Sequence, residues 1–585
     1  MGINLDLTSK CKHKTSTAKS AVKPQQYELP KKNSTLIAKT KGNDEYQRIK
    51  VIGRGGKATG KYSSYVNILD ETNNEVRSID WNGVKDWREL PAEEVLISDE
   101  FKPDDLLASK LKEIEKWNEY EVYTEVENTG QKCISTRWVN TYKNGDINSR
   151  LVARGYEDTE LKERVDSPTC EKSNLRLTIA IAASKGWRIN SLDVQSAFLQ
   201  GEEVEGDIYL RPPKEVNTNK VWKLWKHVYG LKQASRKWYM KLSKELKNLG
   251  VKMCTMDEAF FYFHHDGELC GLLAGHVDDF FWCGSDRFKT EVIDKITSRF
   301  RISSYLHDSF TFLGLKVHQL PSGVILNQSN YADLIQYLKQ NKEAPKHVEL
   351  SNDEKDSLRS VIGQLSWIGN QTRPDISSNV CQLSSNLKNA TISDITFANK
   401  TIRKVRVDKL SLKFPKLNLQ NLQLVVHSDA SHNNLPKGGS QGGYIVFLGD
   451  HEQKVAPIQW QSKRIKRVVK STLAAECLAL EEAVDHAYYM KCIISEIMNV
   501  DIPMHCYIDN QSLCDNLHSS NNVKEDKRLI QDISLLKEMM AKKEISTVEH
   551  VVSKRNLADA LTKRGASCQL LEDVLASGSI GNCAT

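Results

Sequence analysis

Two segments in the first half of the chain place acidic residues in apolar surroundings. Asp193 lies between Leu192 and Val194 in LDVQSAFLQG, and Asp278 and Asp279 interrupt the run LLAGHVDDFFWCG. The second pattern predicts a β-hairpin with adjacent carboxylates at its turn. Two like charges there are costly unless water or a cation neutralises them, so we expect a divalent metal. Asp193 alone has an equally simple alternative role as a helix cap.

A basic and aromatic segment separates these carboxylates. Residues 220–247 contain nine Lys or Arg against the single acid Glu245, and five aromatic residues are interleaved with them. Cations can bind phosphates while aromatic rings stack or pack, which is typical of nucleic-acid binding. An amphipathic helix from Ser235 to Leu249 with a solvated basic face explains only part of the pattern.

A second set of four carboxylates lies in the last third of the chain. VVHSDASHNN predicts a strand that ends at Asp429, and HCYIDNQSL one that ends at Asp509. Glu476 falls on a helix predicted from Ser471 to about Met498, and NLADALTK places Asp559 near the start of a last helix. Each acid taken alone could be a cap or a solvated group. A basic loop before the Glu476 helix is a candidate phosphate contact, with a solvated loop as the alternative, and comprises Lys463, Arg464, Lys466, Arg467 and Lys470.

The elements around these residues are those of a multidomain α/β and α+β protein. The length of 585 residues, with 39% hydrophobic and 27% charged residues, suggests three or four folded units. No apolar stretch is long enough for a membrane span, and the first residues lack a secretory signal, so we expect a cytosolic or nuclear protein. The thirteen cysteines include no C-x-x-C pair, which gives no support to structural zinc.

Composition and periodicity also suggest domain boundaries. Residues 1–61 hold fourteen Lys or Arg against four acids, which predicts a basic, disordered arm. This arm is either a solvated linker or a nucleic-acid-binding tail. The other expected segments are a linker at 62–100 with strand-like pieces, a mixed α/β region at 101–345, a helical region at 346–420, a second α/β domain at 421–565 and a frayed tail at 566–585.

Four ordered motifs carry a family resemblance. LDVQSAFLQG, VYGLKQASRKWY, HVDDF and FLGLKV resemble the palm of the reverse transcriptase of copia-type LTR retrotransposons. RWVNTYKNGDINSRLVARGYED resembles that family's fingers, and LRSVIGQLSWIGNQTRPDIS its segment after the palm. The resemblance covers residues 100–400 and implies a right-hand polymerase with fingers, palm and thumb-like helices. Two positions depart from the family pattern: His276 replaces the usual tyrosine, and Ser235 the usual proline.

The resemblance assigns roles to the palm residues. Asp193, Asp278 and Asp279 become the ligands of two Mg²⁺ ions, with Mn²⁺ as the alternative ion. Phe198 lies beneath the sugar of the incoming nucleotide and selects deoxynucleotides; its alternative role is a core aromatic. Gln233 lies near the nucleotide.

The fingers supply candidate cations. Arg150 and Arg154 are candidates for contact with the triphosphate, although an exposed strand would have the same composition.

The last domain resembles the ribonuclease H that follows the polymerase in the same elements, over about residues 420–565. Asp429, Glu476, Asp509 and Asp559 then form a second two-metal site that hydrolyses the RNA strand of an RNA–DNA hybrid. No protease or integrase signature precedes residue 100, so we expect the C-terminal part of a Pol polyprotein.

This resemblance also implies the partners. They are an RNA template, a DNA or RNA primer, the RNA–DNA hybrid and deoxynucleoside triphosphates, with no membrane, in a cytoplasmic virus-like particle or the nucleus. The oligomeric state stays open. Two alternatives remain: a catalytically idle nucleic-acid-binding remnant, and a ribonuclease H with an idle polymerase scaffold.

Overall fold

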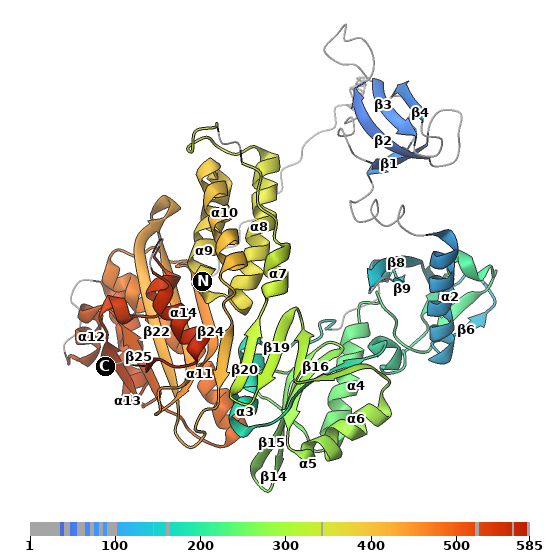
Figure 1. Ribbon diagram of the computed structural model, residues 1–585. Helices are drawn as coiled ribbons and strands as arrows, with labels where there is room; N and C mark the ends of the chain where they lie inside the picture. Colours follow the sequence, from blue (N-terminus) through green and yellow to red (C-terminus); the bar gives the residue numbers. More distant parts are fainter. Residues whose placement is uncertain are drawn as a thin grey trace, which may run out of the picture. The chain divides into compact units, whose positions relative to one another are not determined.

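The computed structural model describes residues 102–143, 146–158, 164–340, 343–520, 526–563, 565 and 567–581, together with the backbone of five strands before residue 90 (Figure 1). The chain divides into two compact units. One comprises residues 1–115 and 138–151, and the other comprises residues 116–137 and 152–585.

The first unit contains an antiparallel sheet with the strand order β4-β3-β2-β1-β5. Its strands are β1 (Thr35–Lys39), β2 (Gln47–Arg54), β3 (Tyr65–Asp70), β4 (Glu75–Asp80) and β5 (Asp86–Glu89). The expectation of a disordered arm over residues 1–61 is therefore wrong for β1 and β2. Both strands have ladder partners beyond residue 61, because β2 pairs with β3 and β1 with β5. The rest of that arm lies outside the described residues.

A helix and a hairpin follow this sheet in the chain. They are α2 (Pro103–Glu119), β8 (Thr136–Lys143) and β9 (Asp146–Ala153). Within the first unit, the Ser109 hydroxyl of α2 donates a hydrogen bond to the carbonyl of Ile147 in β9.

A six-stranded sheet with the order β13-β14-β15-β16-β10-β17 forms the centre of the polymerase-like region. Its strands are β10 (Ile189–Val194), β13 (Lys252–Met253), β14 (Phe260–His265), β15 (Glu268–His276), β16 (Asp279–Gly284) and β17 (Ile302–His307). One face packs against α4 (Ala234–Asn248) and α6 (Asp294–Arg299), and the other against α3 (Lys172–Lys185). The insertion of β10 between β16 and β17 brings Asp193 beside the β15–β16 hairpin.

Helix α3 is buried on nearly all sides. Every residue from Ser173 to Ala183 is buried, as expected for a helix without a solvated polar face. The helix ends at Gly186, whose φ of 69° provides a left-handed cap. Its apolar residues share one core with the last domain, including Phe447 and Ile494. The polymerase-like region and the last domain therefore have a continuous hydrophobic core.

Two smaller sheets flank this centre. One has the order β6-β12-β11-β7, from β6 (Tyr123–Val126), β7 (Cys133–Ile134), β11 (Tyr209–Leu210) and β12 (Val221–Leu224). The other has the order β18-β19-β20-β21, from β18 (Ser309–Phe312), β19 (Leu315–Leu320), β20 (Gly323–Asn327) and β21 (Leu412–Pro415).

The region expected to be helical contains α8 (Asn352–Gln371), α9 (Ser377–Asn386) and α10 (Ile392–Val407), after α7 (Ser329–Leu334). The three longer helices stand together in Figure 1. Strand β21 lies inside the same segment and pairs with β20. Through this pairing, the chain contacts the polymerase-like region again before the last domain begins.

The last domain has a five-stranded sheet with the order β24-β23-β22-β25-β26. Its elements are β22 (Leu422–Leu435), β23 (Gly439–Asp450), β24 (Val455–Arg464), α11 (Thr472–Met498), β25 (Met504–Ile508), α12 (Gln511–His518), α13 (Lys527–Ala541) and β26 (Thr547–His550). The first three strands are antiparallel, whereas β25 and β26 continue the sheet in parallel to β22. This is a ribonuclease H-like α/β topology, and the expected fold class is confirmed.

The expected frayed tail at 566–585 is wrong for α14 (Gln569–Ser577). Leu571, Val574 and Leu575 lie on one face of this helix and are buried in the shared core. In the described part of the chain, no helix is long and apolar enough to cross a membrane.

Candidate active sites

The hairpin expected at the paired carboxylates is present. In the β15–β16 ladder His276 is the partner of Asp279, so Val277 and Asp278 form the turn. Val277 has a φ of 61°, a strained value for a β-branched residue. Its carbonyl accepts a hydrogen bond of 2.7 Å from the indole Nε1 of Trp238, which is fully buried in α4. Helix α4 thus fixes the turn that carries Asp278.

The palm carboxylates meet at one end of the central sheet. Asp193 in β10 is the ladder partner of Asp279 in β16, which places both side chains on the same face. The Val194 amide donates to the Asp278 carbonyl at 3.0 Å and ties the turn to β10. All three aspartates are half-buried. In the described structure, the carboxylate oxygens of these three aspartates do not all lie within 4.8 Å of one another.

Phe198 lies in a short 3₁₀ helix, η3 (Ala197–Gln200). Its ring is half-buried, lies 4.8 Å from the ring centre of Tyr229 and packs against the core beneath α4. The ring therefore contacts the core and also keeps an exposed part.

Gln233 occupies the N-cap position of α4 and is half-buried. With Leu231 and Lys232 it lines a cavity of about 310 Å³. The preceding Gly230 has a φ of +92°, and a Cβ there would lie 2.0 Å from the Ala153 carbonyl oxygen. Glycine is therefore required where this turn crosses the strand end before Arg154.

The two candidate arginines belong to different units. Arg154 is half-buried, and its amide donates to the Ser135 carbonyl at 2.9 Å. Arg150 is exposed on β9 in the first unit.

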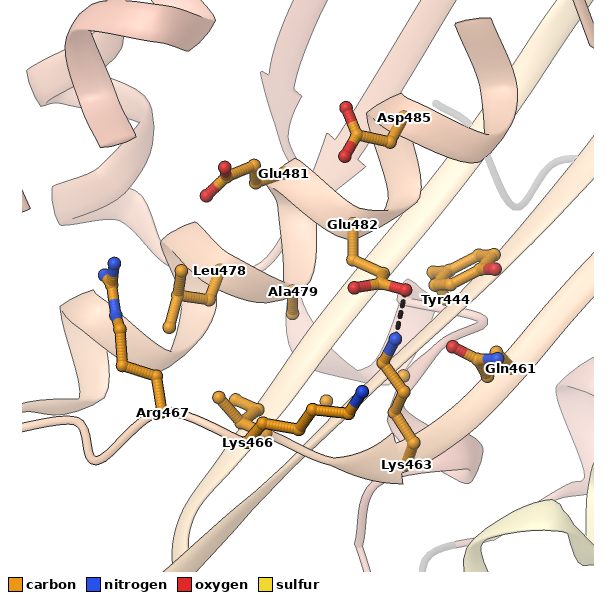
Figure 2. A pocket seen from close by; sticks show the side chains of 13 residues that line it. Tyr444, Gln461, Lys463, Lys466, Arg467, Leu478, Ala479, Glu481, Glu482 and Asp485 are labelled. Atoms are coloured by element: carbon orange, nitrogen blue, oxygen red, sulfur yellow. Dashed lines mark hydrogen bonds and ion pairs between the residues drawn. The ribbon is translucent and has the colours of Figure 1, made fainter. Parts of the chain in front are cut away.

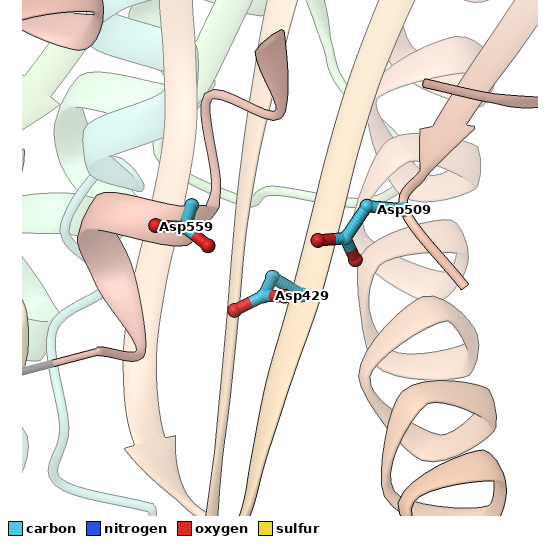
Figure 3. Close-up of side chains that lie close together, drawn as sticks. All are labelled: Asp429, Asp509 and Asp559. Carbon is cyan, nitrogen blue, oxygen red and sulfur yellow. The ribbon is translucent and has the colours of Figure 1, made fainter. Parts of the chain in front are cut away.

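Two of the four C-terminal carboxylates, Glu476 and Asp509, come from the elements that the sequence indicated, whereas Asp559 lies in a 3₁₀ turn and not near the start of the last helix, α14. Asp429, Asp509 and Asp559 have ligand atoms within 4.8 Å of one another, and Figure 3 shows their carboxylates converging. Asp509 follows β25, and Asp559 begins a 3₁₀ turn, η10 (Asp559–Leu561). The expectation that a strand ends at Asp429 is wrong, because β22 continues to Leu435 through its ladder with β23.

The 3₁₀ turn η10 packs closely against strands β22 and β23. Gly443 is the ladder partner of Asp429, and a Cβ there would lie 2.8 Å from the Cβ of Leu561. The Thr562 hydroxyl donates to Asp429, and the Asn556 amide donates to the Ser428 carbonyl at 2.9 Å. Glycine thus allows Asp559 to reach Asp429.

Glu476 is 5% exposed on α11. Ala475, next to Glu476, packs in one cluster with Ala430, next to Asp429, so the two acids come from neighbouring parts of α11 and β22. Burial raises the pKa of Glu476, and the charges of Asp429 and Asp509 raise it further. Its Oε2 atom is buried and has no hydrogen-bond partner. A buried unpaired carboxylate oxygen next to three convergent carboxylates fits a hard divalent cation such as Mg²⁺.

Lys563 is a site residue that the sequence reasoning missed. Its Nζ contacts Asp559, and lies 3.4 Å from Asp429 Oδ1 and 3.7 Å from Asp509 Oδ2. Burial alone would lower the pKa of Lys563, but these carboxylates raise it above its usual value. The four-residue spacing from Asp559 is the sequence signal that could have revealed it.

The basic loop before α11 is partly neutralised. Lys463 pairs with Glu482 and Arg467 with Asp532. Both cations line the pocket shown in Figure 2, in which Lys463 lies near Tyr444. The three remaining cations of this loop, Arg464, Lys466 and Lys470, have exposed side chains.

A central sheet with aspartates on β10 and at the β15–β16 turn, followed by a ribonuclease H-like domain, is the arrangement expected of a reverse transcriptase. Residues 120–345 match a protein-family model described as "Reverse transcriptase (RNA-dependent DNA polymerase)". They form a reverse transcriptase domain.

Several proteins similar to this chain come from transposons. Retrovirus-related Pol polyproteins from transposons RE1 and RE2 of Arabidopsis thaliana are 29% and 28% identical over 74% of this chain, which spans 30% and 31% of their lengths. A putative transposon Ty5-1 protein of Saccharomyces cerevisiae is 29% identical over 50% of this chain and 99% of its own. These matches confirm the resemblance to retrotransposon Pol polyproteins.

Two structures of the foamy viral protease-reverse transcriptase, with double-stranded DNA and with an RNA/DNA hybrid, align with TM-scores of 0.46 and 0.45 at 14% and 12% identity. They cover 90% of this chain and 93% and 72% of their own chains.

Proposed function

We propose that this protein synthesises DNA on an RNA template at the palm and hydrolyses the RNA strand of the resulting hybrid in its last domain. The observation that carries the proposal is the pairing of Asp193 with Asp279 across β10 and β16, next to the turn that carries Asp278. The substrates are a primed RNA template and deoxynucleoside triphosphates, and the product hybrid is the substrate of the second site. The resemblance to retrotransposon proteins favours a cytoplasmic virus-like particle or the nucleus as the place of synthesis.

Each palm residue has a separate task in this proposal. Asp193, Asp278 and Asp279 hold two divalent ions, Mg²⁺ or Mn²⁺, which when bound activate the primer 3′-hydroxyl and stabilise the leaving pyrophosphate. Trp238 keeps the turn in its strained conformation, and Phe198 excludes a 2′-hydroxyl. Gln233 lies near the nucleotide, and Arg154 contacts its triphosphate.

The second site uses Asp429, Glu476, Asp509 and Asp559 as acidic ligands. The unpaired Oε2 of Glu476 is a free acceptor, so this side chain can bind a cation without breaking an existing hydrogen bond at that atom. Arg464, Lys466 and Lys470 extend from the loop before α11 and supply exposed charges for the hybrid's phosphates.

Separate substitutions test the two activities. Asp278→Asn should abolish primer extension on an RNA template and leave hybrid cleavage nearly intact, whereas Glu476→Gln should do the reverse. Asp266→Asn is a matched control, because this exposed residue has a φ of 51°, which asparagine tolerates. Glu538→Gln, at an exposed ion pair on α13, serves the same purpose for Glu476.

The outcomes separate the alternatives. Loss of both activities in each single variant would contradict two independent sites. Hybrid binding without extension or cleavage by the unsubstituted protein would instead establish the idle nucleic-acid-binding remnant.

A further inference from the structure

The ammonium group of Lys563 occupies the space between the aspartates of the last domain. It is within ion-pair distance of Asp429, Asp509 and Asp559, which come from a strand, a strand end and a 3₁₀ turn. These are the same three side chains whose ligand atoms converge within 4.8 Å. One lysine therefore contacts every member of this carboxylate group.

A positive charge is needed at this position. The side chains of Asp429 and Asp509 are 1% and 7% exposed, so water can neutralise little of their charge. Like charges this close and this poorly solvated repel each other strongly. In protein without a divalent ion, Lys563 is the cation that reduces this repulsion.

The side chain of Lys563 is also able to leave. It is 40% exposed, in contrast to the aspartates that it contacts. Lysine carries a compact charge on a flexible four-carbon stem, so its ammonium can swing into water without a movement of the backbone. The buried Oε2 of Glu476 has no hydrogen-bond partner and remains available as a further acidic oxygen.

We propose that Lys563 is a tethered counter-ion that holds the aspartates of the last domain together without metal and is displaced when a divalent ion binds. The inference rests on the proposed metal-dependent hydrolysis at this site. Lys563 thereby sets the ion concentration at which the site becomes loaded, and it acts as a positioning residue rather than as a metal ligand.

Mn²⁺ binding to the full-length protein tests this inference. Titrations followed by electron paramagnetic resonance are made in an Asp278→Asn, Asp279→Asn background, so that the palm contributes little binding. Lys563→Met keeps the length of the stem but removes its charge, and should bind Mn²⁺ roughly tenfold more tightly because the competing cation is gone. Without metal, the same variant should have a lower Tm than the background.

Two controls separate charge from shape. Lys563→Arg keeps the charge and should bind Mn²⁺ less tightly than Lys563→Met. Lys542→Met removes an exposed lysine that pairs with Glu538 on α13, and should leave both the Mn²⁺ affinity and the metal-free Tm unchanged.

The opposing outcomes are distinct. Equal or weaker Mn²⁺ binding by Lys563→Met would overturn the tethered counter-ion, while hybrid cleavage by the parent would leave the proposed function standing. Absence of Mn²⁺ binding at this site in both the background and Lys563→Met would overturn both.

Discussion

The guanidinium carbon of Arg176 lies 3.6 Å from the centre of the Trp460 ring, so a cation of α3 stacks on an indole of β24. Arg176 is 3% exposed and donates hydrogen bonds to the carbonyls of Ile458, Asn370 and Gln371. The indole N–H of Trp460 donates to the carbonyl of Gly369 at 2.8 Å. One buried pair thus joins the palm helix, the end of α8 and the sheet of the last domain.

Arg176→Met should destabilise the whole second unit. The substitution preserves most of the volume but leaves buried carbonyls without donors, which we expect to cost about 3 kcal/mol. Arg176→Lys should restore little, since lysine has no planar fork to reach several carbonyls and stack on an indole. Chemical denaturation followed by tryptophan fluorescence measures the difference. Unchanged stability in Arg176→Met would show that this junction is dispensable.

Trp238→Phe tests whether α4 holds the catalytic turn. The ring remains, but the donor to the Val277 carbonyl is lost, so the strained turn is free to relax. We expect primer extension to fall by roughly tenfold in kcat, with a loss of stability of about 1 kcal/mol. Trp282→Phe is the matched control, because the buried Nε1 of Trp282 has no hydrogen-bond partner to lose. Equal effects of the two substitutions would count against a positioning role for Trp238.

The stability of the metal-free protein should depend on pH because two buried carboxyls of the last domain titrate. Burial is the main cause that raises the pKa of Asp429 from 3.8 to about 7 and that of Glu476 from 4.5 to about 9. These carboxyls have a higher pKa in the folded than in the unfolded state. Such a group contributes its full stabilisation at a pH below its unfolded pKa. This stabilisation is lost as the pH rises through its folded pKa. Hence the Tm in EDTA should fall between pH 4.5 and about pH 9.

A substitution and an added ion isolate this contribution. Glu476→Gln removes the group that titrates highest, so its Tm should decline less above neutral pH than that of the parent. Since metal ligands must be deprotonated, the Tm increase on adding Mg²⁺ should grow with pH in the parent. Parallel Tm profiles for the parent and Glu476→Gln would refute the assignment of the titration to this glutamate.

The parts of the site that sequence could predict are those with local signals. Asp278 and Asp279 interrupt an apolar run, and α11 begins within one residue of the expected Ser471. Features that depend on distant partners could not be found in this way. Strand β22 passes Asp429 because β23 pairs with it, and α14 is ordered because the core covers Leu571 and Val574.

The same limit explains the missed polar residues. Arg176 looks like an ordinary solvated cation in sequence, and only its tertiary neighbours distinguish it. The four-residue spacing of Lys563 from Asp559 indicates one acidic neighbour but not Asp429 or Asp509. Local composition records hydrophobicity and spacing, but it does not record which carboxylates or carbonyls a folded chain brings to a given side chain.

Phe198→Ala should weaken sugar selection. The ring is half-buried against Tyr229, so its removal should cost about 2 kcal/mol of packing and still leave a folded protein. If the exposed part of the ring fills the space of a 2′-hydroxyl, the ratio of kcat/KM for dCTP to that for CTP opposite a template G should fall. Dideoxy and deoxy substrates both lack that hydroxyl, so their relative use should change much less. An unchanged dCTP to CTP ratio in a folded, active Phe198→Ala protein would assign this ring to the core alone.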